Sequence, residues 1–232
     1  MSTNLSGNIL TLNSTGLNEE TLKAIGMFYI PDNCKAGDTV ILDGIECLCV
    51  ATGVTIQGSN LTRIAVDKNY DLGYYQKYIG ITQNSIPTRF SSNYWRWGGS
   101  GTSLGNTSTE IGYGYQNTIN CLSKKEIYTK GTWTGTSSDD GHPWLWLGVN
   151  DFRSTHSDKW FVPSVNETKS YIYDNIPNLV FNSKLGSSKK AYYWTSSESS
   201  ADDAYGVSFN ANGKISAGHK YFTGCIRMCR AF

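Results

Sequence analysis

The sequence predicts an α+β domain with mixed antiparallel sheets, two helices and long loops. Three observations support this class. Short aromatic and β-branched runs, separated by Ser, Asp, Asn and Gly, fill residues 191–232 and predict three closely spaced strands that end at the C-terminus, with Trp194 buried in the first, beside the strand that contains Ile226 to Arg230. Asp43-Gly44 lies between two apolar runs, which is the strongest local signal of a β-hairpin. Ser164 and Glu167 form an S-x-x-E capping box, which marks the start of a helix.

The N-terminal residues, 1–34, are predicted to form an attachment segment. Asn18 can cap a short helix that has Glu19 and Glu20 in its first turn and Gly26 just past its end. The chain before this helix is polar and poor in apolar residues. We therefore expect the segment to dock on another surface or to pair with copies of itself, with a frayed terminus as the alternative.

The globular domain is predicted over residues 35–232. Its first hairpin joins strands at Thr39–Leu42 and Ile45–Val50, and a third strand follows at Leu61–Val66. Near-helical spacing of Ile, Leu and Ile predicts a first helix over Tyr115–Tyr128.

The second helix is predicted to begin at Ser164, so Glu167 has a structural explanation that needs no catalysis. Between the two helices, Trp144 and Trp146 with residues 148–151 predict a buried strand and a turn.

Three ordered segments of the chain resemble the core of bacterial and phage C-type-lectin-like domains. The family has a W-x-x-P-x-x-x-E segment that opens a helix, a YW-[ST]-S-[ST]-E segment, and a closing [VI]-R-x-[CV]-R segment. The matching residues are Trp160, Pro163 and Glu167, then Tyr193 to Glu198, then Ile226 to Arg230. The resemblance implies a C-type-lectin-like fold in which the first hairpin lies beside the terminal strand. Because one fold serves many functions, function has to be argued from the site.

Composition favours a binding surface over a nucleic-acid or membrane partner. Charged residues make up 17% of the chain and the formal net charge is +1, whereas nucleic acids and acidic membranes favour a basic face. The chain has 15 Tyr, 7 Trp and 24 Gly, which is typical of adaptable binding surfaces. The same composition also suits a loop-rich β domain that needs many turns and a full core, and both interpretations stay open.

The six cysteines indicate neither a zinc site nor a secreted disulfide framework. There is no C-x-x-C pair, and the three histidines lie far from any cysteine pair in the sequence. We expect free buried thiols, with late oxidation or metal binding as the alternative. The cysteines are Cys34, Cys47, Cys49, Cys121, Cys225 and Cys229.

The first residues contain no basic flank followed by an apolar run of signal-peptide length. If Met1 is the native start, we expect synthesis and folding in the bacterial cytoplasm without a signal peptide. No stretch approaches the roughly 20 apolar residues of a membrane-spanning helix, so no membrane insertion is expected.

Two long polar stretches, at 83–111 and 132–141, interrupt the predicted elements, and long loops in a compact domain are often functional. In the resemblance, the loops between the helices and the terminal strands form one exposed face, opposite the end where the chain termini meet. Trp95 and Trp97 alternate around Arg96, so both rings are expected on one side of an extended segment. They form either a platform for sugars or a partner, or part of the core. The predicted ligand-binding residues are Tyr94, Trp95, Trp97, Trp133, Asp202, Asp203, Tyr205, His219 and Tyr221.

No catalytic residue and no cofactor is predicted, with calcium as the one metal that stays open. Asp202 and Asp203 lie in a Ser-rich turn and could bind calcium with backbone oxygens. The Glu-Pro-Asn or Gln-Pro-Asp triplet of sugar-binding C-type lectins is absent from the sequence. Asp139, Asp140 and His142 cluster in a stretch that a solvated turn explains.

The resemblance implies a noncatalytic receptor-binding or ligand-binding protein at a phage tail tip, fibre or baseplate. Its partners would be a host cell-surface receptor or glycan and other tail subunits, with a homotrimer as an analogy from tail-tip proteins. The first alternative is a structural or decorating virion protein. The second is an enzyme similar to formylglycine-generating enzymes, which requires paired reactive cysteines. A variant of the first hypothesis is retroelement diversification of residues 193–230.

Overall fold

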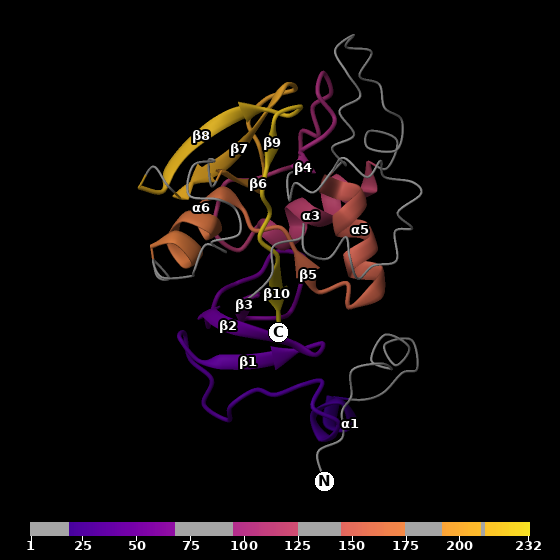
Figure 1. Ribbon diagram of the computed structural model, residues 1–232, viewed down its shortest axis with the longest axis vertical. Helices are drawn as coiled ribbons and strands as arrows, with labels where there is room; N and C mark the ends of the chain where they lie inside the picture. The colour runs from indigo at the N-terminus through magenta and orange to yellow at the C-terminus, as the bar shows by residue number, and fades with distance from the viewer. Residues whose placement is uncertain (1–18, 68–94, 125–144, 175–191, 210–211) are drawn as a thin grey trace.

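The computed structural model of the protein describes residues 19–67, 95–124, 145–174, 192–209 and 212–232 (Figure 1). These residues form a mixed α+β structure with antiparallel sheets and few helices, which confirms the predicted class. The helices are α1 (Glu19–Ala24), α3 (Gly114–Ser123), α5 (Leu145–Thr155), α6 (Val165–Glu167) and the π-helix η2 (Thr168–Tyr173). The strands are β1 (Thr39–Leu42), β2 (Ile45–Ala51), β3 (Ile64–Asp67), β4 (Trp95–Arg96), β5 (Trp160–Phe161), β6 (Tyr192–Glu198), β7 (Asp203–Ser208), β8 (Lys214–His219), β9 (Thr223–Gly224) and β10 (Cys229–Ala231).

Five strands form the sheet nearest the N-terminal segment, in the order β1-β2-β3-β10-β5. The predicted hairpin is confirmed: β1 and β2 pair antiparallel around Asp43 and Gly44, whose φ angles are 53° and 76°. Positive φ at both central residues is the geometry of a type I′ turn, which an Asp-Gly pair adopts readily.

The terminal strand β10 lies in this same sheet, as the resemblance implies, but β3 separates it from the first hairpin. Cys229 pairs with Val66 of β3 on one side and with Phe161 of β5 on the other. The predicted third strand therefore provides the link between the two ends of the domain.

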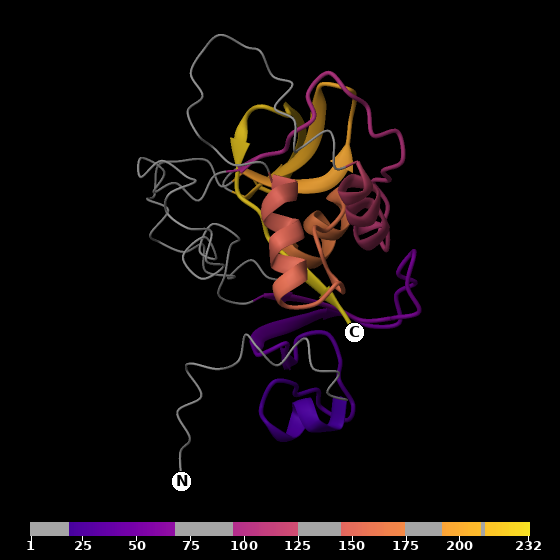
Figure 2. The ribbon, with the colours of Figure 1, turned by 90° about the vertical axis from the view of Figure 1, so that its right-hand side faces the viewer.

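The second sheet has three strands in the order β6-β7-β8 and lies at the opposite end of the molecule (Figures 1 and 2). The prediction that Trp194 is a buried strand residue is confirmed, since it lies in β6 and is 1% exposed. Its neighbouring segment is not β10: the Trp194 N–H donates to the carbonyl of Cys225 at 2.9 Å, just before Ile226. The strand β8 was missed because Lys214–His219 contains a small-residue Ser-Ala-Gly run with weak strand propensity.

The prediction of a buried strand around Trp146 is wrong, because Leu145–Thr155 forms the helix α5. Leu145, Val149 and Phe152 recur at helical spacing and are fully buried. The alternation of Trp and Leu imitates a strand, but the helical period of the following residues prevails. Trp144 lies outside the described residues.

The two other predicted helices are confirmed. The first forms as α3, and the end of its predicted range, 125–128, lies outside the described residues. The second begins at Ser164 and runs through α6 into η2, with Val165 and Ile172 buried against the sheets.

The N-terminal segment packs against the edge of the five-stranded sheet. Gly26 follows α1 with a φ of 75°. Met27 and Phe28 are buried, and the backbone of Tyr29 exchanges two 2.8 Å hydrogen bonds with Ile41 of β1. Asn18, the predicted cap of α1, lies outside the described residues.

Candidate functional site

The predicted aromatic platform at Trp95 and Trp97 is wrong, because both side chains belong to the core. Trp95 is 2% exposed and Trp97 is 1% exposed. The Trp97 indole N–H donates to the Thr195 carbonyl at 2.7 Å, and its ring meets Trp146 edge-on at 5.2 Å between centroids. The alternation of the two tryptophans predicts that they share a side, but it cannot say that this side faces the core. Tyr94, Trp133 and residues 132–141 lie outside the described residues.

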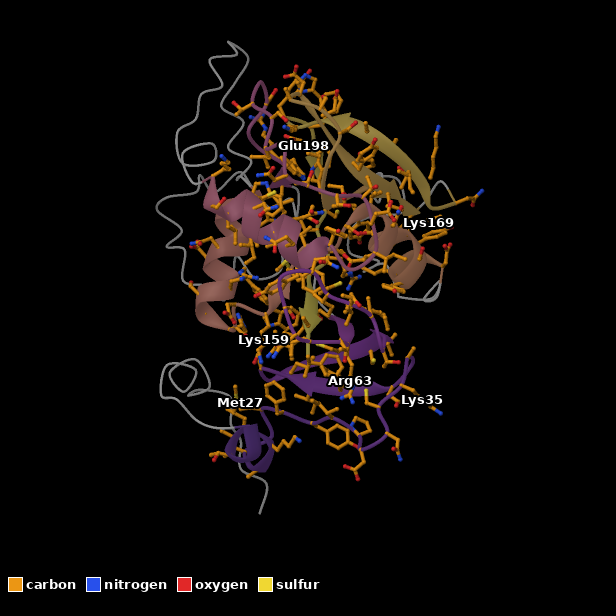
Figure 3. The ribbon with its side chains drawn as sticks, turned by 180° about the vertical axis from the view of Figure 1, so that it is seen from behind. Met27, Lys35, Arg63, Lys159, Lys169 and Glu198 are labelled. Carbon is orange, nitrogen blue, oxygen red and sulfur yellow. The ribbon has the colours of Figure 1, made fainter. Side chains whose placement is uncertain are left out.

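Five of the predicted residues lie at the end of the β6-β7-β8 sheet where β7 begins and β8 ends. Glu198, the last residue of β6, marks this end in Figure 3, away from Met27 of the N-terminal segment. Asp203 pairs with His219 across β7 and β8, and Tyr205 pairs with Ala217. Directly paired residues and residues two apart share one face of a sheet, so Asp203, Tyr205 and His219 share a face. Asp202 precedes β7 in the adjoining turn, and Tyr221 follows β8.

A sixth residue, Phe222, extends this group although the sequence analysis did not select it. It is 54% exposed, and its ring meets Tyr221 at 4.8 Å between centroids. Tyr221 in turn lies 3.9 Å from the His219 ring. The adjacent Tyr221 and Phe222 could have indicated this residue in the sequence, because two aromatic residues in a turn cannot both be expected in the core. We call Asp202, Asp203, Tyr205, His219, Tyr221 and Phe222 the tip surface.

The tip surface combines apolar rings with hydrogen-bond acceptors. Asp202 is exposed, and its Oδ1 accepts from the Ser100 hydroxyl at 3.1 Å. The Oδ2 of Asp203 accepts from the Ser200 hydroxyl at 3.2 Å. A carboxylate has about four lone-pair positions, so each Asp retains capacity for ligand donors. Such a surface can stack against apolar ring faces and accept hydrogen bonds from hydroxyl or amide groups.

A buried ion pair beneath the tip surface holds the segment 98–105 in place. The Nζ of Lys220 donates to Glu198 at 2.5 Å, and the two side chains are 0% and 5% exposed. The same Nζ donates to the carbonyls of Ala201 at 2.8 Å and Thr102 at 3.1 Å, and it lies 5.0 Å from the centre of the Trp97 ring. We call the Glu198–Lys220 pair and its partners the clasp.

Glu198 completes the clasp from the other side. Its carboxylate accepts from the backbone N–H groups of Leu104 at 2.8 Å and Gly105 at 3.1 Å, and from the Ser103 hydroxyl at 3.0 Å. Figure 3 places Glu198 far from Met27 and Lys35, which mark the N-terminal end. The clasp therefore joins the segment 98–105 to the turn that precedes β7 and to the turn that follows β8.

The capping box is confirmed, and it accounts for Glu167. The Ser164 hydroxyl accepts from the Glu167 N–H at 3.3 Å, and the Glu167 carboxylate accepts from the Ser164 N–H at 2.7 Å and the Gly112 N–H at 2.9 Å. Burial raises the pKa of Glu167 to about 7, against the backbone N–H groups of Ser164, Gly112 and Gly114, which lower it.

All six cysteines are free and buried, as predicted. Burial raises the pKa of Cys229 well above the ordinary thiol value, which keeps this residue in the unreactive thiol form. Among the described residues, no three His, Cys, Asp or Glu side chains lie close enough together to bind a metal ion, and this includes Asp202 and Asp203.

Within the described ranges, no helix has the length and apolar character needed to cross a membrane. No family model, no curated protein and no solved structure matches this chain.

Proposed function

We propose that this protein is a noncatalytic binding protein and that it binds its ligand on the tip surface. The observation that carries the proposal is the gathering of rings and carboxylates at one end of the β6-β7-β8 sheet, where Asp202 and Phe222 are exposed and the other four residues are partly exposed. Phe222 is 54% exposed there, within ring contact of Tyr221. Exposed aromatic residues on a well-supported surface carry much of the energy of protein recognition.

The finer proposal is a C-type-lectin-like domain of a phage tail that recognises a host cell-surface receptor or glycan. Its support is the resemblance of three sequence segments, together with a first hairpin and a terminal strand that share one sheet. The N-terminal segment lies at the opposite end from the tip surface (Figure 1). The N-terminal end would then attach to the particle, as a homotrimer or with other tail subunits, and the tip surface would face the host.

Two alternatives make different use of the same surfaces. A structural or decorating virion protein would use the tip surface to contact other virion subunits. An enzyme similar to formylglycine-generating enzymes would need accessible paired cysteines, and the burial of Cys225 and Cys229 at 1% exposure each weighs against it.

The test is binding of the labelled full chain to a panel of bacterial strains and to an array of bacterial surface glycans. Phe222→Ala and Asp202→Ala should each weaken binding about tenfold or more, because they remove a ring and an acceptor from the tip surface. Their melting temperatures should stay near that of the wild type, since both residues are exposed.

Tyr29→Ala is the matched control. Tyr29 is also an aromatic residue with 54% exposure, but it lies on the N-terminal segment. It should leave cell binding unchanged. Loss of binding in Tyr29→Ala, with normal binding in the tip variants, would move the site to the N-terminal end. Normal cell binding in all variants, with defective particle assembly in the tip variants, would favour the decorating protein.

A further inference from the structure

Two of the six free thiols, Cys34 and Cys49, lie next to each other although they belong to different parts of the chain. Cys34 ends the N-terminal segment, and Cys49 is in β2. Besides burial, the Cys34 thiol is one of the groups that raise the pKa of Cys49, so the two side chains lie within interaction range of each other, while the Cys49 thiol itself donates to the Ala51 carbonyl at 3.7 Å. Both residues are part of the same apolar cluster.

The backbone around them explains the approach. The Gly37 N–H donates to the Cys49 carbonyl at 2.8 Å, and the Cys49 N–H donates to the Asp38 carbonyl at 2.9 Å. A turn from Lys35 to Asp38, closed by the Asp38 N–H on the Lys35 carbonyl at 3.1 Å, carries the chain back from Cys34 to β1. These main-chain hydrogen bonds join the residues just before β1 to Cys49, and so they hold the nearby Cys34 beside β2.

Cys34 also differs from the other thiols in its access to solvent. It is 9% exposed, whereas the other five cysteines are 1% exposed or less. An oxidant from solution can reach Cys34 first, and Cys49 is the thiol that lies beside it.

We propose that Cys34 and Cys49 are a disulfide-forming pair that locks the N-terminal segment onto the five-stranded sheet under oxidising conditions. The oxidant class is a low-molecular-weight disulfide such as oxidised glutathione. The Cys34 thiolate attacks one sulfur of that disulfide, the S–S bond breaks, and one glutathione thiolate leaves. Cys49 loses its proton and attacks the Cys34 sulfur, which releases the second glutathione thiolate.

The two cysteines together lose two electrons and two protons, and the glutathione disulfide becomes two glutathione thiols. Burial, with further contributions from Cys34, raises the pKa of Cys49 to about 12, so its thiolate is scarce and its attack on the Cys34 sulfur is expected to be the slow step. The bond would close a loop of moderate length that contains the whole of β1. It would join residues 27–34, which pack on the sheet, to β2 by a covalent link.

The test uses the folded full chain with oxidised glutathione, followed by acid quenching and mass spectrometry without reduction. The expected product has lost two hydrogen atoms, and its digest contains a peptide that links Cys34 to Cys49. Its melting temperature should rise by roughly 5–10 °C and return on addition of dithiothreitol.

Cys34→Ser should abolish the linked product. The matched control is Cys47→Ala, which removes the thiol two positions from Cys49 on the same strand and should leave the link intact. A stable mixed disulfide of glutathione with Cys34, a link to a different cysteine, or no oxidation in the folded state would each overturn the proposal. The digest of the wild-type chain decides the matter even if a variant folds poorly.

Discussion

Two buried ion pairs lie near opposite ends of the molecule, and they hold different kinds of structure. Near the N-terminal end, the Asp43 carboxylate accepts from Arg230 Nε at 2.7 Å and Arg230 Nη2 at 3.2 Å, and from the Trp160 indole N–H at 2.8 Å. This pair connects a hairpin turn to β10 and β5. Beneath the tip surface, Glu198 and Lys220 connect three irregular segments.

The chemistry of each cation fits its place. A guanidinium is planar and meets a carboxylate at two points, so Arg230 sets the orientation of the turn relative to the strand. An ammonium group directs three donors in different directions, so Lys220 can hold a carboxylate and two backbone carbonyls at once. The comparison shows that a two-point arginine contact fixes a turn against regular strands, whereas a lysine with several acceptors joins irregular loops.

A third buried carboxylate completes the comparison. Glu167 is 1% exposed and is held by the backbone N–H groups of Ser164 and Gly112. Backbone donors hold this carboxylate where a cation holds the other two, and burial raises the pKa of Glu167 to about 7.

The largest effect is expected when the Asp43–Arg230 pair is broken. Arg230→Met should reduce the free energy of unfolding by about 3–5 kcal/mol, because it leaves the Asp43 carboxylate buried without its cation. The double variant Arg230→Met with Asp43→Asn should recover much of this loss, since Asn tolerates the left-handed turn position and carries no charge. Urea unfolding measures both. The Arg230 guanidinium also lies 5.5 Å from the centre of the Phe28 ring. Equal losses in the single and double variants would show that this packing matters more than charge.

A smaller global effect is expected at the clasp. Lys220→Met should cost about 3 kcal/mol, at the low end of the range for a broken buried pair, because Glu198 keeps its backbone N–H donors. Amide hydrogen exchange should accelerate in residues 98–105 and remain unchanged in β1–β3. Faster exchange spread evenly over both sheets would contradict the local role of the clasp.

The next effect concerns the pH dependence of stability at Glu167. Its pKa is raised to about 7 in the folded protein, so the unfolded chain releases this proton at lower pH than the folded one. Stability from this group is therefore complete below pH of about 4.5 and is lost as pH rises toward 7, by up to about 3 kcal/mol.

The measurement is the unfolding free energy of the wild type minus that of Glu167→Gln, from pH 4 to pH 8. The subtraction removes the other titrating groups, which both proteins share. The difference should fall as pH rises. A difference that rises with pH would mean that the N–H donors lower the pKa of Glu167 more than burial raises it.

The smallest effect is expected at the cap itself. Ser164→Ala should cost roughly 0.5–2 kcal/mol, because the Glu167 N–H loses its acceptor. The control, Ser154→Ala, changes an exposed Ser of α5 and should stay within about 0.5 kcal/mol of the wild type. If Ser164→Ala costs no more than the control, the capping box contributes nothing measurable to stability.

The sequence by itself determined the features that depend on a few neighbouring residues. The Asp43-Gly44 turn, the Ser164–Glu167 cap and the strand character of residues 193–198 follow from local conformational preferences and nearby hydrogen bonds. The free thiols followed from cysteine spacing. Five of the predicted binding residues lie together, because β7 and β8 pair antiparallel and the turn before β7 therefore lies beside the turn after β8. They are Asp202, Asp203, Tyr205, His219 and Tyr221.

Only the tertiary structure decided which side of each segment faces the core. The Trp95 and Trp97 segment is held by partners distant in the sequence: β4 pairs with β9, and the Trp97 ring packs against Trp146 and beneath Lys220. In α5, the alternating start of the segment fits a strand until the buried positions Leu145, Val149 and Phe152 of the whole helix are known. The clasp joins Thr102 to Lys220 across 118 residues, and no local pattern encodes such a contact. Long-range packing chooses among the conformations that local sequence allows, and here it placed two tryptophans in the core and left Phe222 outside.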